Sequence, residues 1–215
     1  MTIIEAIVVV SGLVSVYFLT RQNIWCWPTG LVSVGLATIV FYDSFLYSDM
    51  ILHVYYFGMN IYGWIHWKRK SENVDELPVT RMSMPSNVKW IVITVIGTIA
   101  WGWAMSHLVL IAEWVLVNID PNIGWASSWA GGAAPVPAFP YGDAFTTVAS
   151  LVAMWFMAQK RIENWVYWFI IDIVAVSIYA MKGLYLFSGQ YFILLILCAM
   201  GFRDWRKSMS ESSIS

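Results

Sequence analysis

Residues 44–67 read SFLYSDMILHVYYFGMNIYGWIHW, and residues 182–205 read KGLYLFSGQYFILLILCAMGFRDW. Aligned at an offset of 138 residues, these stretches and the sequence upstream share four anchors: Leu46–Tyr47 with Leu184–Tyr185, Gly63 with Gly201, Trp67 with Trp205 and Trp27 with Trp165. Anchors that keep one offset indicate an internal duplication. Because both copies lie in apolar sequence, they favour a two-fold transporter or channel with its site between the halves.

The composition is that of an integral membrane protein. Hydrophobic residues make up 60% of the chain and charged residues 12%, with a mean hydropathy of +0.66, whereas soluble domains average about 25% charged residues. A net charge of −1 argues against nucleic acid as a partner. The first apolar run, Ile3–Thr20, lacks a preceding basic residue and a following cleavage site, so it is expected to be a retained span. Cys26 and Cys198 match no metal or redox spacing and are expected to act as small apolar side chains.

A membrane-spanning helix needs about 20 apolar residues, and seven segments qualify. They are residues 3–20, 25–42, 49–67, 89–111, 144–159, 163–181 and 185–203. Two connections are long: residues 68–88 are charged, and residues 112–143, rich in Gly, Pro and Trp, are expected to lie on the membrane surface. The sequence therefore predicts an all-α integral membrane protein with seven transmembrane helices.

The positive charges predict how these helices are oriented. With seven spans, all of the 12 Lys and Arg residues except Lys182 fall on one side of the membrane. Lys and Arg collect in cytoplasmic loops, so the C-terminus is predicted inside and the N-terminus outside. Three spans cross the membrane and one linking span returns the chain, so the two triplets run parallel in a 3+1+3 arrangement. The predicted division is 1–70 for the first three-helix repeat, 71–143 for the linker loop, fourth helix and extracytoplasmic loop, 144–207 for the second repeat and 208–215 for a polar cytoplasmic tail.

Most of the intramembrane polar groups lie on three helix faces. Residues at helical spacing share one face. On this basis the span at 49–67 presents His53, Tyr56, Asn60 and Trp64, the span at 163–181 presents Trp165, Trp168, Asp172 and Tyr179, and the span at 144–159 presents Asp143, Thr147 and Ser150. The predicted substrate-binding residues are His53, Tyr56, Asn60, Trp64, Thr147, Trp165, Trp168 and Asp172.

Asp172 is the most informative of these residues. A carboxylate at the membrane centre costs about 2.5–3.5 kcal/mol on insertion scales, and Asp172 lies near the middle of its span. It either serves a ligand or proton site or is held by a buried hydrogen bond, for which Asn60 and Tyr56 are the expected partners. His53 and Asn60 face the same two alternatives. Trp67, which charged residues follow at once, is expected in the interfacial aromatic belt.

The common catalytic and metal-binding motifs are missing from the sequence. It contains no G-x-x-x-x-G-K-[ST] run, no Ser-His-Asp pattern, no H-E-x-x-H and no C-x-x-C. No enzymatic activity, metal or cofactor is therefore expected. No Lys or Arg lies deep in a span, which disfavours a phosphorylated ligand, because phosphate binds best beside such a charge. Tryptophans, amides and one carboxylate instead suit a flat, uncharged or cationic ring joined to hydroxyls.

Four motifs together resemble the PnuC vitamin transporters. They are Trp25–Cys26–Trp27–Pro28, Asn60–Ile61–Tyr62–Gly63–Trp64 with Trp67, Glu163–Asn164–Trp165–Val166–Tyr167–Trp168, and Gly183–Leu184–Tyr185 followed by Gly201 and Trp205. The resemblance covers residues 3–207 and implies parallel three-helix repeats like those of the SWEET sugar transporters. It also implies a homotrimer in the bacterial inner membrane that moves nicotinamide riboside by facilitated diffusion. A cytosolic nucleoside kinase would then trap the riboside for NAD synthesis. By motif match, Asn60, Trp165 and Trp168 would lie in or near the family's site.

Three alternatives stay open. His53 and Asp172 stand where relatives often carry Gln and Asn, and sister groups carry thiamine or riboflavin, so the identity of the vitamin is undecided. Proton-coupled transport through Asp172 and His53 is a second hypothesis. A membrane anchor or assembly subunit is a third, but it leaves the polar faces of the spans at 49–67 and 163–181 unexplained.

Overall fold

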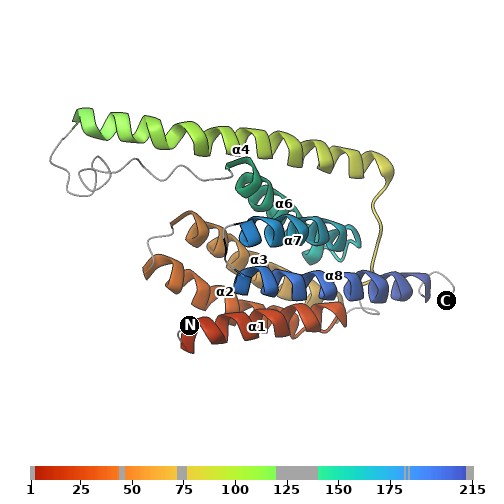
Figure 1. Ribbon diagram of the computed structural model, residues 1–215. Coiled ribbons are helices and arrows are strands. Elements are labelled where there is room, and N and C mark those ends of the chain that lie inside the picture. The colour runs from red at the N-terminus through yellow and green to blue at the C-terminus, as the bar shows by residue number, and fades with distance from the viewer. Residues whose placement is uncertain are drawn as a thin grey trace.

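The computed structural model describes residues 3–43, 47–71, 77–119, 140–181, 183 and 185–211. Within these ranges the chain forms seven helices and no β-strand: α1 (Ile3–Thr20), α2 (Cys26–Asp43), α3 (Tyr47–Ser71), α4 (Met84–Ile119), α6 (Pro140–Ala158), α7 (Glu163–Met181) and α8 (Tyr185–Glu211) (Figure 1). Each predicted span coincides with one of them, so the all-helical prediction is confirmed. Helices α3 and α8 run past their predicted ends because charged residues continue the helix beyond the apolar stretch. Helix α4 also runs past its predicted end and takes up residues 112–119 of the predicted surface loop, and residues 120–139 of that loop lie outside the described residues.

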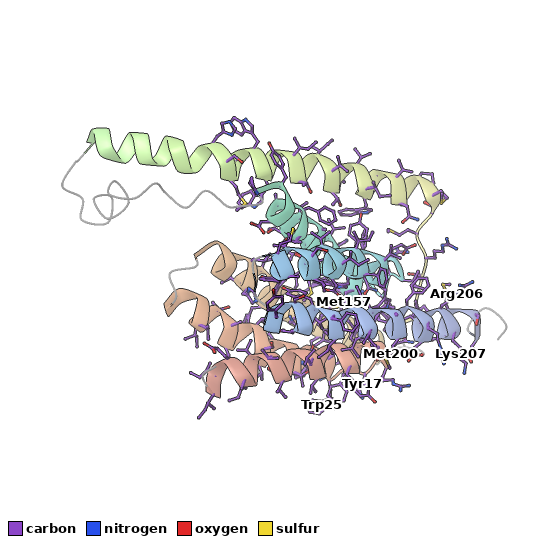
Figure 2. All side chains as sticks on the ribbon, viewed as in Figure 1. Tyr17, Trp25, Met157, Met200, Arg206 and Lys207 are labelled. Carbon is purple, nitrogen blue, oxygen red and sulfur yellow. The ribbon has the colours of Figure 1, made fainter. Side chains whose placement is uncertain are left out.

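Several helices are suited by themselves to cross a membrane. By length and composition these are α1, residues Met84–His107 of α4 and the whole of α7, while Cys26–Val40 of α2 is a shorter apolar helix. Basic residues gather at one end of the bundle, where Figure 2 shows Arg206 and Lys207 near the end of α8. Arg21, which follows α1, reaches the same end and pairs with Asp204, with Nη1 3.6 Å from Oδ2. This end is the predicted cytoplasmic side.

The helices form two triplets that pack in chain order. Helix α2 lies between α1 and α3, and α7 lies between α6 and α8, with contacts between the triplets made by α3 with α6 and by α1 with α8. The linking helix α4 packs along α6 on the outside of the bundle (Figure 1). This is the predicted 3+1+3 arrangement of parallel repeats.

The duplication extends to single hydrogen bonds in the turns. Gln22 follows α1 with a φ of 55°, and Lys160, its equivalent in the second repeat, follows α6 with a φ of 49°. The next amide closes the same bond in both, from Asn23 N to Phe18 O and from Arg161 N to Phe156 O, each 2.9 Å. A left-handed residue closed by a bond across the last turn is a common helix C-cap. Each repeat therefore turns from its first to its second helix in the same way.

Four tryptophans form the core near these turns. Trp27 meets Trp67 edge to face at a centroid distance of 5.2 Å, and Trp165 meets Trp205 in the same way at 5.5 Å. The ring of Trp27 lies on Gly63 and the ring of Trp165 lies on Gly201, where a Cβ atom would overlap the indole. Trp67 is only 4% exposed. Its predicted place in the interfacial belt is therefore wrong, because the duplication puts Trp67 on the seam between the repeats.

Candidate functional site

A polar contact joins the two repeats halfway along α3 and α6. The Tyr56 hydroxyl donates to Ser150 Oγ at 2.6 Å, and the neighbouring Tyr55 hydroxyl donates to the carbonyl oxygen of Leu151 at 3.1 Å. Ser150 in turn donates to the carbonyl of Thr147 at 2.8 Å, which holds the serine in place. These bonds cross from one triplet to the other about halfway along the bundle.

Asn60 is fixed one helical turn further along α3. Its Nδ2 donates to the Tyr56 carbonyl at 2.8 Å, and the side chain is 4% exposed. Gly30 of α2 lies against it so closely that a Cβ atom there would overlap Asn60 Oδ1. The glycine therefore lets a hydrogen-bonding amide sit between two helices of the first repeat. Ser15, whose Oγ donates to the Cys26 carbonyl at 2.6 Å, borders the same place.

Asp172 is buried in the middle of α7, with 3% of its surface exposed. Its Oδ2 accepts a hydrogen bond from the Cys198 thiol, with Sγ 3.3 Å away. The expected partners of Asp172 were Asn60 and Tyr56, and Cys198 was expected to be merely apolar, so both expectations need correction. The offset of 138 residues aligns Cys198 with Asn60. The same alignment could have identified this thiol as the polar partner in the second repeat.

Tyr191 connects Asp172 to the first repeat. The Tyr191 hydroxyl lies within electrostatic range of both the Asp172 carboxylate and the Tyr56 hydroxyl. Its ring stacks on Tyr179 of α7, with centroids 5.3 Å apart and planes 13° from parallel. Tyr191 is the equivalent of His53, whose own ring meets Tyr56 edge to face at 5.5 Å. His53, Tyr56, Tyr191 and Asp172 thus form one cluster across the repeats. Sequence reasoning placed Tyr179 on the face of Asp172 but left Tyr191 out of the predicted site.

The other predicted site residues are less closely gathered. Trp168 is partly buried and packs against both core clusters, next to Ile171 and Ala153. Trp165 is 1% exposed within the tryptophan core, and Trp64 is 39% exposed. Thr147 bonds to the Asp143 carbonyl at 2.9 Å. The structure thus places Trp165 toward the turns rather than beside Asp172.

The predicted cytoplasmic end of the seam is filled by side chains. Lys160, only 3% exposed, donates to Gln22 Oε1 at 3.2 Å and lies over the Trp67 ring at 4.5 Å. Trp67 Nε1 donates to the Ala158 carbonyl and Trp205 Nε1 to the Leu19 carbonyl, each at 3.0 Å. These bonds tie each repeat to the other, which closes the path at this end.

A segment before α4 covers the same end, and we call residues 77–83 the strap. Leu77 and Val79 are buried in the tryptophan core. Thr80 pairs with the α6–α7 turn, because its N donates to the Lys160 carbonyl and its carbonyl accepts from Ile162 N, both at 3.0 Å. The strap therefore adds backbone hydrogen bonds to a seam otherwise closed by side chains.

Two equivalent indole nitrogens in this closed end lack partners. Trp27 Nε1 and Trp165 Nε1 are buried with no hydrogen-bond partner among the described residues. An unsatisfied buried donor costs about 1–3 kcal/mol. The packing of each repeat therefore carries the same energetic cost at the same position.

Duplicated parallel triplets, apolar outer helices and a polar cluster between the repeats define a multi-pass membrane transporter of the two-fold repeat class. The model of one family, described as Nicotinamide mononucleotide transporter, matches residues 2–207. The chain belongs to this family, which confirms the resemblance to the PnuC transporters.

Named relatives show how the family's cargo varies. The Nicotinamide riboside transporter PnuC of Escherichia coli is 30% identical over 97% of this chain and 87% of its own length. The Riboflavin/roseoflavin transporter RibM of Streptomyces davaonensis is 24% identical over 91% of this chain and 81% of its own. The crystal structure of the vitamin B3 transporter PnuC shares the fold, with a TM-score of 0.67 and 21% identity over 97% of this chain and 82% of that one.

Proposed function

We propose that this protein is a uniporter that moves nicotinamide riboside by facilitated diffusion along the seam between residues 1–70 and residues 144–207. The observation that carries the proposal is the polar cluster at mid-membrane, in which Tyr56 bonds Ser150 across the repeats and the buried Asp172 accepts from Cys198. The name of the 30% identical E. coli relative supports the choice of cargo.

The chemistry of the cluster suits a cationic ring joined to a sugar. The pyridinium of nicotinamide riboside carries a positive charge, which the Asp172 carboxylate balances. Trp168 offers an aromatic face, and a desolvated cation over such a face gains about 2 kcal/mol. Asn60 and the Tyr56–Ser150 pair supply donors and acceptors for the ribose hydroxyls. We assign His53, Trp64 and Thr147 to the approach to this site, and Trp165 to its cytoplasmic floor.

The position of the buried cation Lys160 favours the riboside over its phosphorylated form, because Lys160 lies at the cytoplasmic end and not at mid-membrane, where the ligand binds. Among the described residues, Lys160 is the one basic side chain that is fully buried. Its ammonium group is engaged by Gln22 and the Trp67 ring at the cytoplasmic end. A phosphate at mid-membrane would therefore lack the charge-assisted hydrogen bonds that such groups require.

Transport in this scheme requires the closed end to open. The two repeats would rock against each other, as in other transporters built from repeats. Rocking would part Lys160 from Gln22 and Trp67 from Trp205, while the turn in each repeat stays rigid. No proton, metal or cofactor is needed for this cycle, and no bond of the cargo is broken.

The cellular setting follows from the same proposal. We infer a homotrimer in the bacterial inner membrane, with the linker and α4 in residues 71–143 and a polar cytoplasmic tail at 208–215. A cytosolic nucleoside kinase would phosphorylate the riboside after entry and keep the gradient inward.

Calorimetry on the purified protein tests the choice of cargo. The ligands compared are nicotinamide riboside, nicotinamide mononucleotide, thiamine and riboflavin. Binding of the riboside alone is expected, and binding of thiamine or riboflavin in its place would overturn the assignment.

A further inference from the structure

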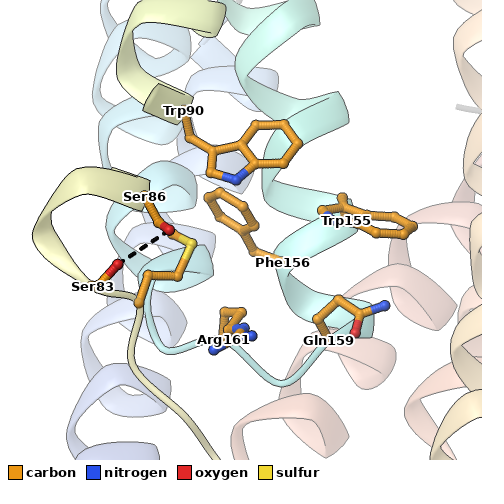
Figure 3. Close-up of a pocket in the computed structure, with 8 residues that line it drawn as sticks. Ser83, Ser86, Trp90, Trp155, Phe156, Gln159 and Arg161 are labelled. Atoms are coloured by element: carbon orange, nitrogen blue, oxygen red, sulfur yellow. Dashed lines mark hydrogen bonds between the residues drawn. The ribbon is translucent and has the colours of Figure 1, made fainter. Parts of the chain in front are cut away.

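A cavity lies away from the seam, between the start of α4 and the end of α6. It measures about 410 Å³ and has one polar wall and one aromatic wall (Figure 3). Arg161, Ser83 and Ser86 contribute to the polar wall, and the two serine hydroxyls hydrogen-bond each other at 3.2 Å. None of these residues belongs to the polar cluster around Asp172.

Arg161 carries a positive charge that nothing in the described part of the chain neutralises. No hydrogen bond or ion pair engages its guanidinium group among the described residues. The nearby carboxylate of Glu163 does not pair with Arg161: its Oε1 accepts from Met82 N at 2.8 Å, and its buried Oε2 has no hydrogen-bond partner among the described residues. A forked guanidinium beside two hydroxyls is well suited to bind a phosphate.

The first turn of α4 adds to this preference for an anion. Ser83 stands just before α4, and its carbonyl accepts the first helical bond, from Asn87 N at 3.0 Å. The free amides at the start of a helix favour a negative charge. Arg161 and this helix start face the same cavity from two different elements.

The aromatic wall indicates where the rest of the ligand lies. Trp90 meets Phe156 edge to face at 5.2 Å, and Trp155 is 38% exposed. Trp155 also stacks on Tyr62 of α3, with centroids 5.7 Å apart, so the aromatic surface continues along the outside of the bundle. Helix α4 lies on that outside (Figure 1), where a membrane protein meets lipid. A soluble anion would make no use of this apolar wall.

We propose that this cavity binds an anionic phospholipid of the cytoplasmic leaflet. The phosphate bonds to Arg161 and the serine hydroxyls, and the glycerol and upper acyl chains lie against Trp90, Trp155 and Phe156. Basic and aromatic residues are the usual anchors at this depth. Because the backbone of Lys160 and Ile162, on either side of Arg161, holds Thr80 of the strap, the bound lipid stabilises the closed cytoplasmic end.

The test is a lipid titration of the full-length protein in detergent, followed by native mass spectrometry. The wild type should bind phosphatidylglycerol more tightly than phosphatidylcholine, and Arg161→Gln should weaken phosphatidylglycerol binding about tenfold, the loss expected for one charge-assisted hydrogen bond. Arg206→Gln is the matched control, since Arg206 lies on the same side but outside the cavity (Figure 2). It should bind phosphatidylglycerol like the wild type.

Two further arms keep the test decisive. Ser83→Ala with Ser86→Ala removes two hydroxyls, one exposed and one partly buried, and leaves Arg161 in place, so it reports on the cavity even where Arg161→Gln folds poorly. It should also weaken phosphatidylglycerol binding. Equal losses in Arg161→Gln and Arg206→Gln, or no loss in either cavity variant, would overturn the proposal. Displacement of phosphatidylglycerol by an equal concentration of inorganic phosphate would also overturn it, in favour of a soluble anion.

Discussion

Lys160 and Gln22 occupy the same position in the two repeats, 138 residues apart, and their side chains meet, with Lys160 Nζ 3.2 Å from Gln22 Oε1. Trp67 and Trp205 are likewise equivalent, and their rings lie 6.2 Å apart. In a parallel repeat, equivalent residues approach each other only near the pseudo-two-fold axis. These two contacts therefore mark the axis, and both lie at the closed cytoplasmic end.

Linking the two repeats at this point should block transport. In the variant Gln22→Cys with Lys160→Cys, a short bis-methanethiosulfonate, which joins the two thiols through disulfides, should reduce riboside uptake into proteoliposomes to background, and a reducing agent should cleave those disulfides and restore uptake. Both single-cysteine variants also carry the native buried thiols of Cys26 and Cys198, so they control for any reaction there. The reagent should leave each single-cysteine variant active. Undiminished uptake after complete cross-linking would show that the cytoplasmic end does not part during transport.

Gly63 and Gly201 should be the least tolerant glycines. A Cβ atom at either position overlaps a tryptophan ring, of Trp27 or of Trp165. Overpacking of this kind costs about 1–3 kcal/mol, so Gly63→Ala and Gly201→Ala should each lower the unfolding midpoint. Gly58 and Gly189 are matched controls in the same two helices, because a Cβ atom there meets nothing within 4 Å. Alanine at the control positions should raise the midpoint, through its higher helix propensity.

Two tryptophan variants should affect different properties: Trp67→Ala should lower the stability of the fold, and Trp168→Ala should weaken riboside binding. Trp67 is buried and donates to the Ala158 carbonyl, so its removal should cost about 3–5 kcal/mol of stability. Trp168 is only partly buried, and its removal should instead weaken riboside binding about tenfold, through loss of an aromatic face for the cation. Thermal unfolding and calorimetry on both variants measure the two effects. A larger binding defect in a folded Trp67→Ala protein would refute the assignment of Trp168.

The number and order of the helices could be predicted from the sequence because apolar length is a local property. The bounds of α1 and α7 match the predicted spans to the residue. Partners across the seam could not be predicted in the same way. Cys198 looked apolar by composition, and Trp67 looked interfacial because charged residues follow it. Their contacts depend on how α3, α6, α7 and α8 pack against one another. The spacing of residues within a single helix does not determine that packing.

Asp172 should act as a binding group rather than a proton carrier. Replacement by Asn keeps the size of the side chain and its bond to Cys198, but removes the charge that balances the pyridinium. Asp172→Asn should weaken riboside binding, and a protonophore should leave the uptake by wild-type protein unchanged. Accumulation above the outside concentration that a protonophore abolishes would instead establish proton coupling through Asp172 and His53.

Uptake of labelled nicotinamide riboside by proteoliposomes that contain only this protein tests the central claim most directly. Saturable entry should stop when the inside and outside concentrations are equal, and nicotinamide mononucleotide should neither enter nor compete. Encapsulating a nucleoside kinase with ATP should then drive entry further without changing the protein. Absence of riboside uptake, with saturable uptake of thiamine or riboflavin by the same vesicles, would contradict the account.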